Sequence, residues 1–137
     1  MDKFSKFFLL SVFGFALFGF QTGSRCDLTV KFPQLEDHEG KIFIKLLDKN
    51  EELVDRATVN VKRGVPQYTF MKLKAGSYAV VAFQDLNGNK DIDKGFFGQP
   101  TEPYGFSNNV RGTFGPPSFE KQLFKLSGNK VIEVILD

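Results

Sequence analysis

Apolar and polar residues alternate along much of the chain, with the period of two that β-strands show when one face is buried. Residues 28–32 (LTVKF) and residues 57–61 (ATVNV) both follow this pattern. Residues 77–84 (SYAVVAFQ) are apolar at both alternating sets of positions, which is typical of a central strand. We predict strands at residues 27–33, 41–47, 57–62, 67–73, 77–84, 119–126 and 130–136.

The order of these segments predicts an all-β fold without a long helix. After residue 24 no segment keeps apolar residues at a helical period for three turns, and residues 48–56 predict a polar loop or one helical turn. About seven short strands separated by turn residues predict a single antiparallel sandwich of the immunoglobulin-like or prealbumin-like kind. The sequence SGN at residues 127–129 predicts a hairpin between the last two strands.

The connection LKAGSY, residues 73–78, supports this architecture. Gly76 suits a tight turn between strands, and Tyr78 is expected to place its ring in the core while its hydroxyl reaches nearby backbone. The segment is similar to a Leu-x-x-Gly-x-Tyr step that many secreted sandwich modules carry. That similarity bears on the architecture and not on the function.

The first 24 residues predict a secretory signal peptide. Lys3 and Lys6 precede an apolar run at residues 7–20, which is short for a membrane-spanning helix of about 20 residues. Residues 25–137 then form one domain. Cys26 is the single cysteine, so it forms no disulfide within the chain. Three fates of Cys26 stay open: a lipid anchor, which Arg25 before it disfavours, a free thiol, and removal with the signal.

Charge narrows the classes of partner. The formal net charge of the 137-residue chain is +2, and no basic excess favours nucleic acid. We expect an exported monomer, periplasmic or extracellular, that contacts a membrane only through its signal segment if that segment is not cleaved.

Residues 85–93 (DLNGNKDID), the acidic segment, place carboxylate and amide groups at alternate positions. This spacing matches a calcium loop that uses side chains at positions 1, 3 and 5, a carbonyl at 7 and a further group at 9. Lys90 stands where such loops have glycine, and Phe96 stands where they have a bidentate glutamate. Glu102 is the candidate for the missing ligand. The predicted ligands are Asp85, Asn87, Asn89, Asp91, Asp93 and Glu102.

Two interpretations of the acidic segment stay open at this point. Asparagine and aspartate also stabilise turns through bonds from side chain to backbone, so the segment could be a polar turn without metal. If it binds calcium, the affinity is expected to be weak and the role structural. Magnesium demands a stricter geometry, and zinc lacks ligands because His38 is the only histidine.

Residues 95–118 (GFFGQPTEPYGFSNNVRGTFGPPS) are rich in glycine, proline and aromatic residues. A loop of this length in a compact domain is usually functional. We expect its aromatic side chains to pack onto the sandwich. Flat rings beside amides and a cation suit a glycan or a protein strand, although the same side chains also suit turn caps and core positions. The candidate ligand-binding residues are Tyr104, Phe106, Asn108, Asn109 and Arg111.

The strings LKAGSYAVVAFQDLNGNKDID, GFFGQPTEPYGFSNN and FGPPSFE closely resemble domain-of-unknown-function family 2141, a family of small secreted bacterial proteins. The resemblance extends over nearly all of the chain after residue 24. It implies an exported single β-sandwich domain and no established biochemical activity.

These observations predict a non-catalytic binding or accessory module of the bacterial cell envelope, with a calcium-stabilised loop and a glycan or envelope protein as partner. His38 lies in a charged turn, and Cys26 lacks the electropositive setting that a catalytic thiol needs. Two alternatives stay open. One is a glycosidase-like hydrolase that uses Asp93 or Glu102, and the other is a purely structural envelope protein.

Overall fold

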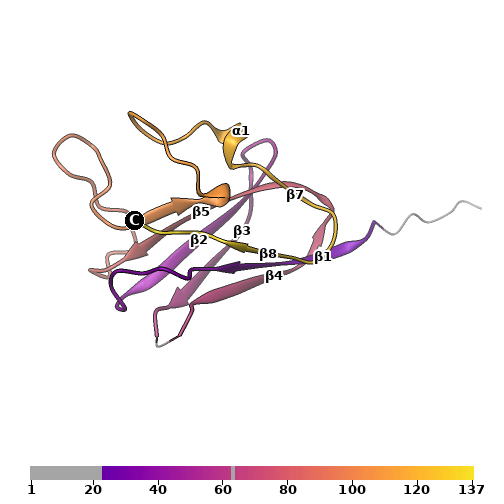
Figure 1. Cartoon of the computed structure of the whole chain (residues 1–137), viewed down its shortest axis with the longest axis horizontal. Helices are drawn as coiled ribbons and strands as arrows, with labels where there is room; N and C mark the ends of the chain where they lie inside the picture. Colours follow the sequence, from indigo (N-terminus) through magenta and orange to yellow (C-terminus); the bar gives the residue numbers. More distant parts are fainter. Residues whose placement is uncertain (1–22, 63) are drawn as a thin grey trace, which may run out of the picture.

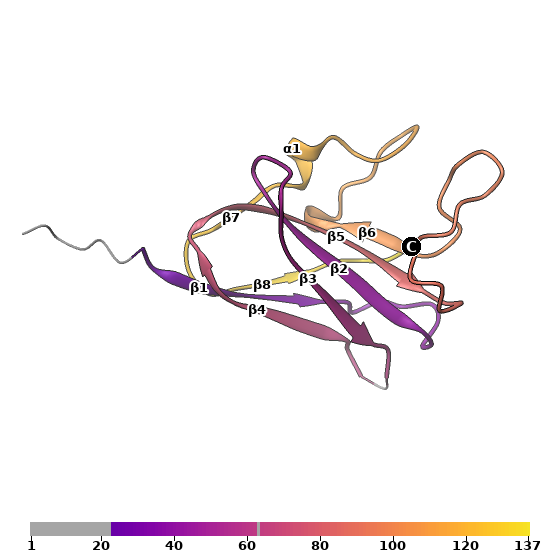
Figure 2. The same ribbon diagram turned by 180° about the vertical axis from the view of Figure 1, so that it is seen from behind.

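The computed structural model describes residues 23–62 and 64–137, which form two β-sheets packed face to face (Figures 1 and 2). The first sheet has the order β4-β1-β8, and the second has the order β3-β2-β5-β6 with β7 also paired to β5. The predicted all-β sandwich is confirmed. The strands are β1 (Arg25–Lys31), β2 (Lys41–Asp48), β3 (Leu53–Asn60), β4 (Gln67–Lys74), β5 (Gly76–Asp85), β6 (Tyr104–Phe106), β7 (Phe124–Leu126) and β8 (Lys130–Glu133).

The core lies between the sheets and is formed by the alternating apolar positions. Leu28, Val30 and Phe32 are fully buried, as the period of two predicts. Cys26 continues this series and is also a core residue. The buried residues of the core are Cys26, Leu28, Val30, Phe32, Ile42, Ile44, Leu46, Phe70, Leu73, Tyr78, Val80, Ala82, Phe124, Leu126, Val134 and Leu136.

Strand β4 departs from strict alternation. Phe70 and Leu73 both face the core although three positions separate them. Lys72 between them has a φ of 58°, and the pairing with β1 shifts register near Cys26. A bulge of this kind moves the following side chain to the opposite face of the strand. Met71 is left exposed on the outer side of the first sheet.

Strand β5 is the central strand, since it pairs with β2, β6 and β7. At its start Tyr78 buries its ring, and its hydroxyl donates to the carbonyl of Lys74 at 2.8 Å. The prediction for Tyr78 is confirmed. Burial is the main cause that raises the pKa of its phenol above the usual 10.0.

The predicted C-terminal hairpin is wrong. Residues Phe119–Gln122 form a short helix, α1, and β7 follows it in the second sheet, whereas β8 pairs in parallel with β1 in the first sheet. Helix α1 is held by Ser107 and Asn108 of a 3₁₀ turn, η1 (Ser107–Asn109), which donate to carbonyls of residues 121–123. The SGN turn therefore carries the chain from one sheet to the other instead of closing a hairpin.

A second difference concerns β3, which begins at residue 53 within the expected polar loop. The carboxylate of Asp48 accepts from the backbone N–H of Asn50 and of Glu52, so the chain reverses within a few residues. Strand β3 is then an edge strand whose first four residues are exposed, which hides the strand pattern in the sequence.

The predicted signal peptide, residues 1–24, lies almost entirely outside the described residues. Within residues 23–62 and 64–137, no helix is long and apolar enough to cross a membrane.

Candidate functional site

An aromatic surface covers the outer face of the second sheet. Phe43 of β2 and Phe83 of β5 are direct partners in the register, and their rings stack with centroids 5.3 Å apart. Beside them, Tyr104 and Phe106 of β6 meet edge to face with centroids 5.8 Å apart. Strand alternation places all four rings on the side opposite the core, where they form a floor.

Two loops rise from the same side of this floor (Figures 1 and 2). The first loop, residues 86–103, joins β5 to β6, and the second loop, residues 110–118, joins η1 to α1. Together with the floor they line a groove of about 1250 Å³. Among the residues that the structure describes, five charged ones line the groove, and four of them are cations. The charged residues are Lys45, Arg56, Lys90, Lys94 and Asp91.

The expectation that the loop aromatics pack onto the sandwich is wrong for three of them. Phe96, Phe97 and Phe114 have exposed fractions of 96%, 88% and 102%. Gly98 donates its N–H to the carbonyl of Gly95 at 2.9 Å, so Phe96 and Phe97 occupy the two corner positions of a tight turn. Corner side chains point away from the chain that the turn reverses, and they are therefore presented to solvent.

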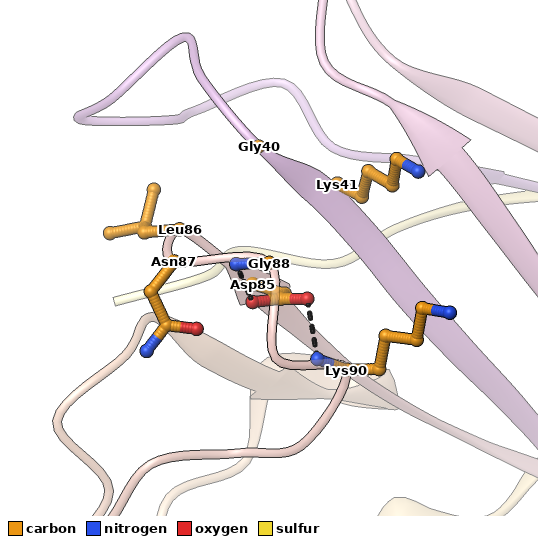
Figure 3. A pocket seen from close by; sticks show the side chains of 7 residues that line it. All are labelled: Gly40, Lys41, Asp85, Leu86, Asn87, Gly88 and Lys90. Atoms are coloured by element: carbon orange, nitrogen blue, oxygen red, sulfur yellow. Dashed lines mark hydrogen bonds between the residues drawn. The ribbon is translucent and has the colours of Figure 1, made fainter.

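The acidic segment lies at the root of the first loop, and its first residue, Asp85, is 2% exposed. The side chain of Asp85 faces the backbone of the turn that follows it (Figure 3). Its two oxygens accept from the backbone N–H of Gly88 at 2.8 Å and of Lys90 at 2.9 Å. Gly40, directly before β2, packs against this point with a φ of 74°, and a Cβ there would overlap the backbone carbonyl oxygen of Asp85. The start of the segment is thereby fixed to the sheet.

Further bonds wind the segment into a compact loop. The side-chain oxygen of Asn87 accepts from the N–H of Asn89, and that of Asn89 accepts from the N–H of Asp91, both at 3.0 Å. Both asparagine amides also donate to the carboxylate of Asp93. Lys90 has a φ of 67°, so it adopts the left-handed conformation that glycine usually supplies at position 6 of a calcium loop.

Glu102 comes back to the acidic segment from the far end of the first loop. Its side chain is 6% exposed, and its two oxygens accept from the N–H of Leu86 at 2.9 Å and of Asp93 at 3.2 Å. The predicted candidate for the closing ligand is therefore in contact with both ends of the segment. A carboxylate that accepts two backbone bonds keeps lone pairs for further donors or a cation.

No group of three or more histidine, cysteine, aspartate or glutamate side chains in the described part of the chain is arranged to hold a metal ion. A calcium loop also draws on amide and carbonyl oxygens. The structure brings Asn87, Asn89, Asp93 and Glu102 together, while the carboxylate of Asp85 faces the backbone of the turn. Asp91 turns to its neighbour, because its carboxylate accepts from the N–H of Ile92.

The five candidate ligand-binding residues separate into two groups. Tyr104 and Phe106 line the groove. Asn108 donates to the carbonyls of Lys121 and Leu123, and Asn109 bonds to the backbone of residues 133 and 135. Both have positive φ values, which asparagine tolerates better than most residues. These two asparagines hold the chain in place rather than face the groove.

Arg111 also has a structural role. Its guanidinium donates to the carbonyls of Tyr104 and Ile135, forms an ion pair with Asp137 and lies 5.5 Å from the centroid of the Tyr104 ring. It therefore joins Ile135 and Asp137 to β6 and holds Tyr104 of the floor in place.

Sequence reasoning found Tyr104 and Phe106 of the floor but did not find Phe43, Phe83 or the cations. Phe43 and Phe83 stand at the outward positions of two strands whose inward positions are already apolar. One signal in the sequence could have predicted this floor: each of two neighbouring strands carries an aromatic residue at an outward position. Lys45 and Arg56 join the floor only through strand pairing over distance in the sequence.

The profile of a family described as "Uncharacterized protein conserved in bacteria (DUF2141)" matches residues 30–133. No curated protein and no solved structure matches the chain. The matched residues extend from the end of β1 to the end of β8 and include the floor of the groove and both loops. The chain therefore belongs to this family of conserved bacterial proteins.

Proposed function

We propose that this protein is a non-catalytic binding module of the bacterial cell envelope that receives its ligand in the groove and whose first loop is stabilised by calcium. The observation that carries the proposal is the groove itself. Stacked rings form its floor, two loops form its walls, and cations outnumber carboxylates along it. Apolar walls with a few oriented charges are typical of ligand sites.

Three features of the acidic segment support calcium. The side chains at positions 3 and 5 form successive turns, Lys90 at position 6 is left-handed, and Glu102 contacts both ends of the segment. Calcium would take the place of the two asparagine amide groups at the Asp93 carboxylate, whose oxygens would then ligate the ion. The expected dissociation constant is on the order of 0.1 to 1 mM, as in extracellular modules.

The calcium part is tested by thermal unfolding with chelator and then with millimolar calcium or magnesium. A ligand that binds only the native state raises the melting temperature. We expect a rise that is selective for calcium and that is lost in Asn87→Ala and Asp93→Ala. Asp91→Ala is the matched control, because position 7 ligates through its carbonyl and its side chain is not needed. Equal melting temperatures with and without calcium would leave the segment as a polar turn.

The groove is tested with anilinonaphthalene sulfonate, an aromatic anion whose fluorescence rises in apolar surroundings. We expect the folded protein to bind it, and Phe83→Ser to weaken binding by about tenfold through loss of one ring from the floor. Met71→Ser, at an exposed position on the other sheet, is the control. If both variants bind the probe equally, the groove is not the binding site.

The hydrolase alternative gains no support from the geometry. Glu102 is buried against the acidic segment, and neither Asp93 nor Glu102 lines the groove. A pair of carboxylates that cleaves a glycosidic bond must flank the bound sugar. A purely structural envelope role has no specific observation in its favour.

A further inference from the structure

We propose that the tips of the two loops insert into an anionic lipid bilayer, so that the groove opens onto the membrane surface. This inference rests on the proposed function, because it names the partner of the same face. It goes beyond the expectation that membrane contact is confined to residues 1–24.

The tip of the first loop is built to present two phenylalanines. Residues 94–100 form a small hairpin, with a bridge between Lys94 and Pro100 at its base and a bond from Gly95 N–H to the carbonyl of Gln99 at 2.7 Å. Phe96 and Phe97 stand at its corner with ring centroids 5.3 Å apart. Any polar residue would serve such a turn in water, so two exposed rings require an apolar partner.

The second loop presents a third phenylalanine on the same side. Phe114 is fully exposed, and the loop below it is tight, because a Cβ on Gly112 would overlap the carbonyl oxygen of Gly115. Phe97 and Phe114 both line the groove from opposite walls. The two loops project to the same side of the molecule in both views (Figures 1 and 2).

The order of residues behind the tips favours a bilayer over a protein surface. Rings are outermost, Lys94 lies at the base of the small hairpin, and Lys45 and Arg56 lie deeper on the floor. A bilayer has the same order, with acyl chains beyond an anionic layer of phosphates. Aromatic side chains are favoured near this interface, and lysines behind them bind anionic headgroups.

Tryptophan scanning tests the proposal at each loop separately. The chain has no tryptophan, so a single substitution gives one local fluorophore. Phe97→Trp and Phe114→Trp report on the two tips, and Met71→Trp reports on an exposed position of the other sheet. The full chain is mixed with vesicles of phosphatidylcholine and phosphatidylglycerol that carry bromine on their acyl chains. A local readout is needed because the apolar residues 7–20 can bind vesicles themselves.

We expect bromine to quench tryptophan at positions 97 and 114 and to leave position 71 unquenched. Quenching at all three positions would show unspecific adsorption and would overturn the proposal. Quenching at none of them would also overturn it, and a glycan or protein would then be the partner of this face.

A second measurement separates the inference from the proposed function. Phe96→Ser and Phe114→Ser, combined with the reporter Phe97→Trp, should remove most of the bromine quenching at position 97, because two of the three rings that insert are lost. Vesicles of phosphatidylcholine alone should bind the unaltered tips less tightly. If quenching at position 97 is unchanged by these substitutions while the groove still binds the anionic probe, the membrane inference fails and the binding module stands.

Discussion

The core and the loop tips of this protein use the same residue type in opposite ways. Phe32 and Phe70 are 0% and 1% exposed between the two sheets, whereas Phe96 and Phe114 are 96% and 102% exposed. Phe70 stands on β4 and Phe32 directly follows β1, where the alternation of the strands directs their side chains into the sandwich. The second pair stands in the two loops, where the ring of Phe96 meets that of Phe97 edge to face and both Phe96 and Phe114 are presented to solvent. Phenylalanine side chains therefore contribute to the core in one region, whereas in the other they are exposed and available to a partner.

Truncating one ring in each region tests most directly whether the core and the loop tips differ in their contribution to stability. Phe70→Ala should lower the free energy of unfolding by about 3 to 5 kcal/mol, because it leaves a cavity between the sheets. Phe114→Ala should change it by less than about 0.5 kcal/mol. Urea unfolding of both variants measures the difference, and similar losses would mean that the second loop packs onto the sandwich.

The next largest loss of stability is expected at Gly40, where the sheet packs against the acidic segment. Gly40→Ala should cost about 2 kcal/mol or more, because φ is positive there and the new methyl group meets the backbone of Asp85. Gly88→Ala is the matched control, since its φ of 80° adds strain but no atom lies within 4 Å of its Cβ. Equal losses in chemical denaturation would contradict the close approach.

Glu102→Gln tests how much the bonds of Glu102 to the acidic segment contribute to stability. The variant loses one of two oxygens that accept from the backbone N–H of Leu86 and Asp93, which should cost about 1 to 2 kcal/mol. It should also lose any rise in melting temperature with calcium. A full calcium response in this variant would remove Glu102 from the ligand set.

The smallest expected effect is at Tyr78, on the core side of β5. Tyr78→Phe loses the bond to the carbonyl of Lys74 and should cost about 1 kcal/mol at neutral pH. Because the pKa of the folded phenol is raised, the unfolded chain loses this proton first as the pH rises above 10.0, and the stability falls from there up to the folded pKa. The variant should lack that part of the alkaline decline in unfolding free energy.

The difference between core strands and loops also explains which parts of the structure the sequence predicts. Alternation placed both ends of β2, β4 and β5 within one residue and both ends of β1 within two, and the Tyr78 bond followed from the turn before it. It missed the start of β3, because an edge strand with exposed residues has no apolar face. It also mistook residues 119–126 for one strand, since the polar groups of η1 that hold α1 come from a distant turn.

The candidate site was predictable in part for the same reason. The ligand spacing of the acidic segment is local, and the structure brings Asn87 and Asn89 to the carboxylate of Asp93 and Glu102 to its N–H, while calcium binding by these residues stays a prediction. The floor depends on pairing between strands, and the fate of Phe96 and Phe97 depends on a turn bond. Hydrophobicity alone predicted burial for those rings, whereas backbone geometry exposes them.

Hydrogen exchange of the full chain, alone, with calcium and with anionic vesicles, tests the central claim that the two loops form the binding face. We predict that calcium slows exchange in residues 85–93 and that vesicles slow it at the turn of residues 95–98 and in residues 112–115. Exchange in β1 and β4 should not change. Slowing confined to the first sheet, or no slowing in either loop, would contradict the account.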